Sequence, residues 1–400
     1  MLSPSLALLI SIAGILILLR LKWHPGLAVF AGSLIIMLLV LPLPSIPSKM
    51  WHTLFDLPTL RLLVVVASAL TLSGLMEAKG LLARMAITLE SIGPRVALHL
   101  IPAAIGLVPM PAGALVSATA SQGLAKRLGL TPERATFINY WFRHIWEFCV
   151  PVYPGIIITS AVLSVPLFAV VKILSPATAL AIVFGVIISY RILRKTPKTE
   201  GHPTKNIFFN LVKSAWPILL LVPLVLLGLE TMIAFPLILV LLAVQQRPEW
   251  PELKKALKYG LEPKILFLLY AIMLYQATIV SSGAAKILIA DMQAIGLPDL
   301  LVLVALPLLL GLSTGYSPAV AGIALPLLLP YIVSGSGINA PVLLVAYVSG
   351  FMGVLLSPLH LCLILSTEYF KASLARVYRY VLPLTVGIEA IVLLYYFIAT

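Results

Sequence analysis

The segment GLVPMPAGALVSATASQG (residues 106–123) interrupts a long apolar stretch with prolines and a glycine, and GLSTGYSPAVAG (residues 311–322) interrupts another in the second half of the chain. Proline removes a backbone N–H and disfavours helix in the residue before it, while glycine permits open backbone. Each segment therefore predicts two short helices that meet at a non-helical tip, at residues 109–113 and 313–318.

The composition places these broken segments in a membrane protein. Of the 400 residues, 61% are hydrophobic and only 10% are charged, whereas a soluble domain of this length needs more charge to cover its surface. The net charge is +13, and the Lys and Arg residues lie in loops beside apolar runs, a distribution that orients a membrane protein. No segment resembles a nucleic-acid-binding module, so we expect no nucleic-acid partner.

Apolar runs of membrane-spanning length predict ten crossings. Two further apolar stretches, 96–127 and 298–333, are too long for one span and are broken near the middle. We interpret each as a re-entrant hairpin, whose open backbone is tolerated only where it is buried in protein or lines a cavity. The predicted crossings cover residues 4–20, 25–45, 58–77, 133–165, 169–192, 212–230, 232–246, 263–281, 340–366 and 378–398.

The basic residues predict an orientation with both termini outside. In this arrangement the inner loops carry most of the Lys and Arg residues, including a run from Arg191 to Lys213, and the outer side keeps Lys49, Lys172 and Lys286. The N-terminal apolar run has its charges after it, so we interpret it as a retained span and not as a cleaved signal peptide. The chain is expected in the cell (inner) membrane, surrounded by lipid.

The two halves of the chain resemble each other. Gly106 matches Gly311 at an offset of 205, and Pro151 matches Pro358 at an offset of 207. An odd number of crossings in each half turns the second copy upside down, and inverted repeats with broken helices are typical of secondary transporters. The predicted parts are a first repeat (1–193) whose hairpin opens to the cytoplasm, a cytoplasmic linker (194–211), and a second repeat (212–400) whose hairpin opens to the outside.

Each predicted hairpin is followed by a span that is broken at proline, in FCVPVYPG (148–155) and in LLSPLHLC (355–362). Helix N-termini at such breaks present free N–H groups to an anion. Free carbonyls, together with the hydroxyls of Ser313, Thr314 and Ser317, suit a sodium ion. The alternative is that proline merely kinks these helices, as it commonly does in membranes.

Ionisable residues inside the predicted spans are few, which makes Arg143, His144 and Glu147 candidates for function. Arg143 and Glu147 stand at positions i and i+4, and two interpretations stay open. They form an internal ion pair on one helix face, or Arg143 binds a substrate carboxylate or phosphate while Glu147 or His144 carries a proton. His360 aligns with Tyr153 between the halves and is interpreted as a lone, satisfied histidine.

The remaining polar groups are given structural interpretations. The six histidines do not cluster along the sequence, and Cys149 and Cys362 lack metal-ligand spacing, so we expect no enzyme. Glu230 and Glu389 are placed at span ends. The candidate substrate- or ion-binding residues are Pro109, Met110, Pro111, Ala112, Gly113, Ser117, Arg143, His144, Glu147, Pro151, Tyr153, Ser313, Thr314, Gly315, Tyr316, Ser317, Pro318, Ser357, Pro358 and His360.

With two hairpins of opposite entry, two broken helices and five crossings in each half, the chain resembles the ion transporter superfamily. The motifs GLVPMPAGA, RHIWEF and PVYPG are similar to those of an uncharacterised prokaryotic family of about ten-span integral membrane proteins within it. The resemblance implies that substrate binds between the hairpin tips and the helix breaks. It also implies that the hairpins and broken helices move together, elevator-like, against a scaffold, and that the protein is a homodimer. The dicarboxylate symporters of the superfamily have a serine-asparagine-threonine tip, which VPMPAGA replaces here, so dicarboxylate specificity does not carry over.

Together these observations predict an all-α secondary active transporter that couples a small anionic organic solute to Na⁺ or H⁺ by alternating access. The sequence has no G-x-x-x-x-G-K-[ST] motif, so transport driven by nucleotide hydrolysis in this chain is not expected. Two alternatives stay open: an inorganic-ion antiporter that needs Glu147, and a lipid-phosphate flippase that uses the same arginine and helix N-termini. No cofactor is expected beyond a sodium ion near Ser313, Thr314 and Ser317.

Overall fold

A computed structural model describes residues 3–110, 113–194, 196, 206–334 and 337–400. These residues are helical apart from loops and one antiparallel pair of two-residue strands, β1 (Val333–Ser334) and β2 (Gly337–Ile338). The helices are α1 (Pro4–Arg20), α2 (Pro25–Val40), α3 (Ser45–Phe55), α4 (Leu57–Ala78), α5 (Leu81–Glu90), α6 (Pro94–Gly106), α7 (Gly113–Arg127), α8 (Pro132–His144), α9 (Pro154–Leu163), α10 (Leu167–Leu193), α11 (Ile207–Leu226), α12 (Thr231–Gln246), α13 (Trp250–Gly260), α14 (Pro263–Ser282), α15 (Ala284–Ala294), α16 (Asp299–Thr314), α17 (Ser317–Ile332), α18 (Ala340–Leu356), α19 (Leu361–Phe370) and α20 (Leu374–Ala399).

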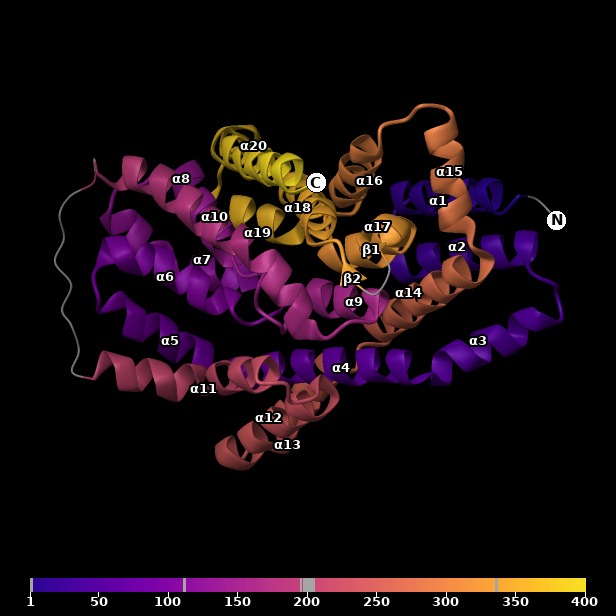
Figure 1. The fold of residues 1–400 in the computed structure, drawn as a ribbon. Helices are drawn as coiled ribbons and strands as arrows, with labels where there is room; N and C mark the ends of the chain where they lie inside the picture. Colours follow the sequence, from indigo (N-terminus) through magenta and orange to yellow (C-terminus); the bar gives the residue numbers. More distant parts are fainter. Residues whose placement is uncertain (1–2, 111–112, 195, 197–205, 335–336) are drawn as a thin grey trace.

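Six helical segments in the described residues are long and apolar enough to cross a membrane. They coincide with six of the ten predicted crossings, and the other four predicted crossings fall in the shorter helices α1, α2 and α12 and in the broken pair α8 and α9. The six segments are Leu57–Ala78, Leu167–Leu193, Ile207–Leu226, Trp250–Ser282, Ala340–Phe370 and Leu374–Ala399. In Figure 1, α4 and α11 lie in the lower part of the molecule, above α12 and α13, and α20 lies in the upper part.

Proline and capping side chains set where many of these helices begin. Proline is favoured in the first helical turn because its missing N–H would have no partner there. In α4, Pro58 follows Asp56, whose side chain accepts a hydrogen bond from Thr59 N at 2.8 Å. The same arrangement begins α18, where the Asn339 side chain accepts from Val342 N at 3.3 Å.

Four short helices lie outside the long apolar segments or at their ends. Two of them, α5 and α13, have amphipathic sequences at residues 81–90 and 250–260. Helices α3 and α15 were not predicted, because each has only 11 residues and neither is apolar enough to stand out as a span. The Lys79–Glu252 ion pair, at 2.8 Å, joins α13 to the end of α4.

Helix α18 forms the centre of the core, whereas α20 keeps an exposed apolar side. From Val342 to Leu355 every residue of α18 is buried. In α20, Leu382, Val386 and Leu394 are exposed, as expected of a helix that faces lipid. At the break that follows α18, Ser357 and His360 are buried as well, whereas Pro358 and Leu359 between them are exposed.

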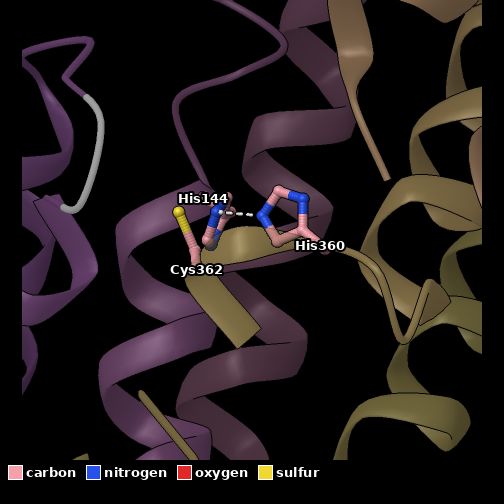
Figure 2. A group of neighbouring side chains, drawn as sticks. All are labelled: His144, His360 and Cys362. Carbon is pink, nitrogen blue, oxygen red and sulfur yellow. Dashed lines mark hydrogen bonds between the residues drawn. The ribbon is translucent and has the colours of Figure 1, made fainter. Parts of the chain in front are cut away.

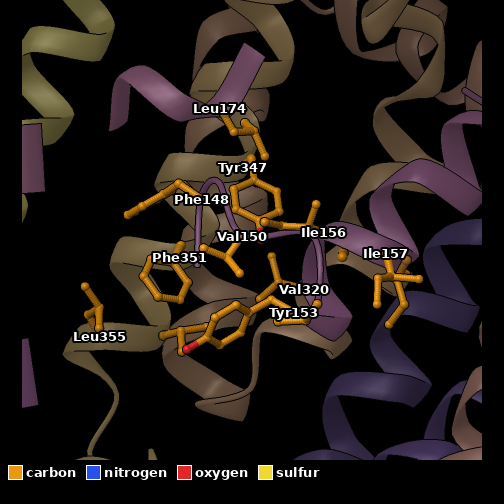
Figure 3. Packing of buried hydrophobic residues seen from close by; sticks show 14 of the residues in the cluster. Phe148, Val150, Tyr153, Ile156, Ile157, Leu174, Val320, Tyr347, Phe351 and Leu355 are labelled. Carbon is orange, nitrogen blue, oxygen red and sulfur yellow. The ribbon is translucent and has the colours of Figure 1, made fainter. Parts of the chain in front are cut away.

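The two halves of the chain share one core. Figure 3 shows residues of the first broken segment, among them Phe148 and Tyr153, packed against side chains of α17 and α18. The rings of Phe148 and Phe351 meet edge to face with centroids 4.8 Å apart, an arrangement that aromatic quadrupoles favour. The first broken segment is therefore held in place by helices of the second half.

Both stretches predicted as hairpins form two packed helices with a non-helical tip. Helix α6 packs on α7 and α16 packs on α17. The second tip is short: Gly315 adopts a φ of +61° at the end of α16, and Tyr316 is extended before α17 begins. The following helices are broken as well, between His144 and Pro154 and between Leu356 and Leu361.

Candidate functional site

Each broken helix is hydrogen-bonded to the helix tip of its own half. In the first half the Tyr153 hydroxyl donates to Gly106 O, and Arg143 Nη2 donates to Met110 O at 3.1 Å. In the second half Ser357 Oγ donates to Leu312 O at 2.7 Å, and His360 Nδ1 donates to Gly315 O at 2.7 Å. Carbonyls that a broken helix leaves without partners are thus satisfied by side chains of the adjacent break.

Further hydrogen bonds join the two breaks to each other across the halves. Tyr140 of α8 donates its hydroxyl hydrogen to Leu355 O at 2.9 Å, and Tyr347 of α18 donates to Glu147 O at 3.0 Å. Ser317, the first residue of α17, donates to Glu147 Oε2 at 3.0 Å. The two tips and two breaks therefore form one buried polar centre, which we call the central cluster.

Arg143 is the cation of the central cluster. Its side chain is almost fully buried. Among the residues that the structure describes, no carboxylate forms an ion pair with its guanidinium. Nη2 has a carbonyl partner, but Nε is buried and has no hydrogen-bond partner among the residues that the structure describes. The guanidinium lies against Gly113, where an added Cβ would touch both Nη2 and Nε. A positive side chain therefore adjoins the first residue of α7, the end of a helix that is itself electropositive.

The prediction that Arg143 and Glu147 share one helix face is wrong. Helix α8 ends at His144, and the amide of Glu147 bonds to His144 O in a tighter turn. The carbonyl of Arg143 is covered by Gly106 of α6, where an added Cβ would meet that oxygen. The close packing of α6 against the end of α8 coincides with the end of the regular helix at His144. Arg143 and Glu147 bind other partners and do not form an ion pair with each other.

Glu147 is a buried carboxylate that faces the second half of the chain. Its Oε1 lies 3.8 Å from His144 Nε2, and its Oε2 accepts from Ser317. Gly155, at the start of α9, makes room beside this contact, because an added Cβ would lie 3.0 Å from the Tyr347 hydroxyl. Glu147 is therefore placed to respond to any shift of α17 relative to the first break.

The interpretation of His360 as a lone histidine is also wrong. Its Nε2 lies 3.0 Å from His144 Nε2, and both side chains are buried. One ligand atom each from His144, His360 and Cys362 lie within 4.8 Å of one another, and Figure 2 shows the two imidazoles facing each other with the Cys362 thiol beside them. The histidines do not cluster along the sequence, but the fold brings residues 216 positions apart into contact.

Several predicted site residues contribute in other ways or lie elsewhere. Ser313 and Pro358 are exposed. Ser117 donates its hydroxyl hydrogen to a carbonyl of its own helix. Of the other two hydroxyls proposed for sodium, Thr314 donates to Leu310 O of its own helix and Ser317 donates to Glu147, so the three hydroxyls do not share one set of partners. Pro109, Pro151 and Pro318 are buried, and Tyr316 is half-buried beside the second tip. Pro111 and Ala112 lie outside the described residues.

Some residues of this region were not anticipated from the sequence. Tyr140 and Tyr347 stand at matching positions of the two halves, at the same offset of 207 as Pro151 and Pro358, and that match is the available signal in the sequence. Asn139 donates from Nδ2 to Ala114 O and to Ser366 Oγ, at 3.0 and 2.9 Å. Glu389 was placed at a span end but lies well inside α20, where its carboxylate accepts from Ser349 of α18. That prediction is wrong because α20 runs from Leu374 to Ala399 and Glu389 lies in its interior.

A cavity of about 680 Å³ lies away from the central cluster. It is enclosed by parts of α4, α9, α10, α11 and α12, and its rim holds the Arg61–Glu230 ion pair at 2.6 Å. Both partners are about half exposed, and exposed ion pairs contribute little to stability. None of the described tip and break residues lines this cavity, so we place the candidate site at the central cluster, where the buried charges are.

The long apolar helices and the exposed apolar face of α20 define this chain as a helical integral membrane protein. A family model described as "Protein of unknown function (DUF401)" matches residues 2–398. The chain belongs to this family. None of the curated proteins compared with the chain matches it.

Proposed function

We propose that this protein is a secondary active transporter that moves a small anionic solute through the central cluster, coupled to a cation. The observation that carries the proposal is the position of Arg143. A buried guanidinium without a carboxylate partner is costly, and here it also adjoins the electropositive first turn of α7. An anion bound between Arg143 and the N–H groups of that turn would offset both charges.

The finer architecture belongs to the same proposal. We infer ten crossings and two re-entrant hairpins in two inverted repeats, 1–193 and 212–400, as in the ion transporter superfamily. Support comes from the matching sets of contacts, because in each half the residues of a break bind carbonyls of the preceding tip. A tip and break held together in this way could move as one unit against α4, α11 and α12 in an elevator-type homodimer.

Glu147 and Ser317 are the residues we propose for coupling. Ser317 Oγ and Glu147 Oε2 join the second tip to the first break at 3.0 Å, so a cation that neutralises Glu147 would alter the contact between the two halves. A proton can do this directly at the carboxylate, and a sodium ion can do it through Glu147 and nearby hydroxyl oxygens. Solute uptake into the same proteoliposomes under a proton gradient or under a sodium gradient distinguishes proton coupling from sodium coupling.

The first test is binding by the purified protein. Thermal unfolding is followed with organic carboxylates, inorganic phosphate and short-chain lipid phosphates, with and without sodium. Stabilisation by a carboxylate or by phosphate supports the proposal, and stabilisation only by lipid phosphates favours a flippase. If no anion raises the unfolding temperature, the proposed function is wrong.

The second test assigns the site. Arg143→Gln removes charge-assisted hydrogen bonds worth about 1.5–3 kcal/mol, so we expect anion affinity to fall roughly 10- to 100-fold. Arg143→Lys keeps the positive charge but loses the planar guanidinium. Its anion affinity should lie between those of the unaltered protein and Arg143→Gln. Arg127→Gln is the matched control, because Arg127 pairs with Glu90 on an exposed surface. Full anion affinity in Arg143→Gln would remove this residue from the site.

A further inference from the structure

The two breaks meet at a pair of imidazoles. His144 is the last residue of α8, and His360 is the N-cap residue of α19. Their rings meet edge to face with centroids 5.0 Å apart, and the two Nε2 atoms are 3.0 Å apart. Both side chains are buried, so this contact takes place without bulk water.

The hydrogen bonds on the other ring nitrogens fix the tautomer of each histidine. His144 Nδ1 lies 2.6 Å from Tyr140 O, and His360 Nδ1 lies 2.7 Å from Gly315 O. A carbonyl oxygen only accepts, so both Nδ1 atoms carry a hydrogen. In neutral rings both Nε2 atoms then present lone pairs to each other across 3.0 Å. Such a contact is repulsive unless a positive species, a proton or a metal ion, binds between them.

The surroundings favour a metal ion over a proton alone. Cys362 Sγ and one nitrogen of each histidine lie within 4.8 Å of one another, and thiolate with imidazole is a donor set that zinc prefers. Histidines that bind metals usually donate their other N–H to a carbonyl or carboxylate, which fixes the ring orientation. Both histidines here make that bond. Glu147 Oε1 lies 3.8 Å from His144 Nε2 but outside the group of three ligand atoms, so its side chain has to move toward the histidines to complete a four-coordinate site.

We propose that His144 Nε2, His360 Nε2 and Cys362 Sγ bind a divalent ion of the zinc class, with Glu147 as the fourth ligand. Two nitrogens about 2.0–2.1 Å from a tetrahedral ion stand about 3.3 Å apart, so the histidines need to separate only slightly. Binding converts the Cys362 thiol to a thiolate and releases one proton, while the neutral imidazoles release none. The thiolate and the Glu147 carboxylate together balance the two positive charges of the ion.

This site would link the two halves of the chain, since His144 and Glu147 come from one half and His360 and Cys362 from the other. The proposal does not depend on anion transport. A bound ion reports its ligands through its spectrum, whether or not any solute crosses the membrane.

The test is Co²⁺ binding to the purified full-length protein after chelator treatment. We expect one equivalent of Co²⁺ to give thiolate-to-cobalt charge-transfer absorption in the near ultraviolet and intense visible bands of a tetrahedral ion, both removed by Zn²⁺. Cys362→Ser should abolish the charge-transfer band. Cys149→Ser is the matched control, because Cys149 is likewise half-buried but lies outside the cluster, and it should leave the spectrum unchanged.

Two further variants test the histidines. His360→Ala should lower Co²⁺ affinity by at least about 10- to 100-fold, the loss seen even for outer-shell partners of a metal, whereas His52→Ala, on an exposed surface, should not change it. If the unaltered protein gives no charge-transfer band, or if the band persists in Cys362→Ser, the proposal is wrong. If the unaltered protein lacks the charge-transfer band, the species between His144 Nε2 and His360 Nε2 is a shared proton and not a metal ion.

Discussion

Arg143 shows how much at this site depends on single atoms. Its guanidinium is buried against Gly113, Nε has no partner among the described residues, and its carbonyl is covered by Gly106. Both contacts require glycine, because any side chain at either position would occupy the space of Arg143. The sequence motif GLVPMPAG therefore contains two glycines whose role is to let α6 and α7 approach the end of α8.

Gly113→Ala tests this at the residue scale. The added methyl meets the guanidinium, and overpacking of this kind costs about 1–3 kcal/mol, so we expect a lower unfolding temperature and weaker anion binding. Gly123→Ala on the same helix is the control, since its added Cβ meets nothing within 4 Å. It should stabilise α7 by up to about 1 kcal/mol. Equal effects of the two substitutions would contradict the close approach described here.

At the scale of elements, the tips and breaks work in pairs. Gly315 ends α16 with a φ of +61°, and an added Cβ would meet the backbone of His360 and Leu359. The sequence predicted both the tip and the break, because proline and glycine act locally on the backbone. It did not predict that the tip and the break would touch, because that contact joins segments 45 residues apart.

Gly315→Ala separates backbone strain from this contact. Gly296 also has a positive φ, of +75°, but has nothing within 4 Å of an added Cβ. Gly296→Ala should therefore cost only the strain of the left-handed conformation, about 1–2 kcal/mol. Gly315→Ala should cost clearly more and should also alter the Co²⁺ spectrum, because it displaces His360. Thermal unfolding and absorption of both variants measure this, and a Gly315→Ala protein that behaves like Gly296→Ala would exclude a tight tip–break contact.

At the scale of the whole molecule, the basic loops predict the orientation of the chain in a membrane. Cysteines introduced at Ser48 and Lys255, both exposed, test the orientation inferred from the charges. In intact cells a membrane-impermeant maleimide should label Ser48→Cys, and Lys255→Cys should react only after permeabilisation. The unaltered protein gives the background from Cys149 and Cys362. The opposite labelling pattern would mean that the termini face the cytoplasm.

The sequence by itself determined the class of protein, the positions of most helices and the places where they break. These follow from apolar runs, prolines and glycines, whose effects are local. Only the tertiary structure decided what meets at the breaks. In the folded chain Glu147 lies beyond the end of the helix that carries Arg143, and Glu389 lies in the interior of α20. His144 lies beside His360 and Cys362. Those contacts depend on how two halves of a chain pack on each other, and no spacing within one segment contains that information.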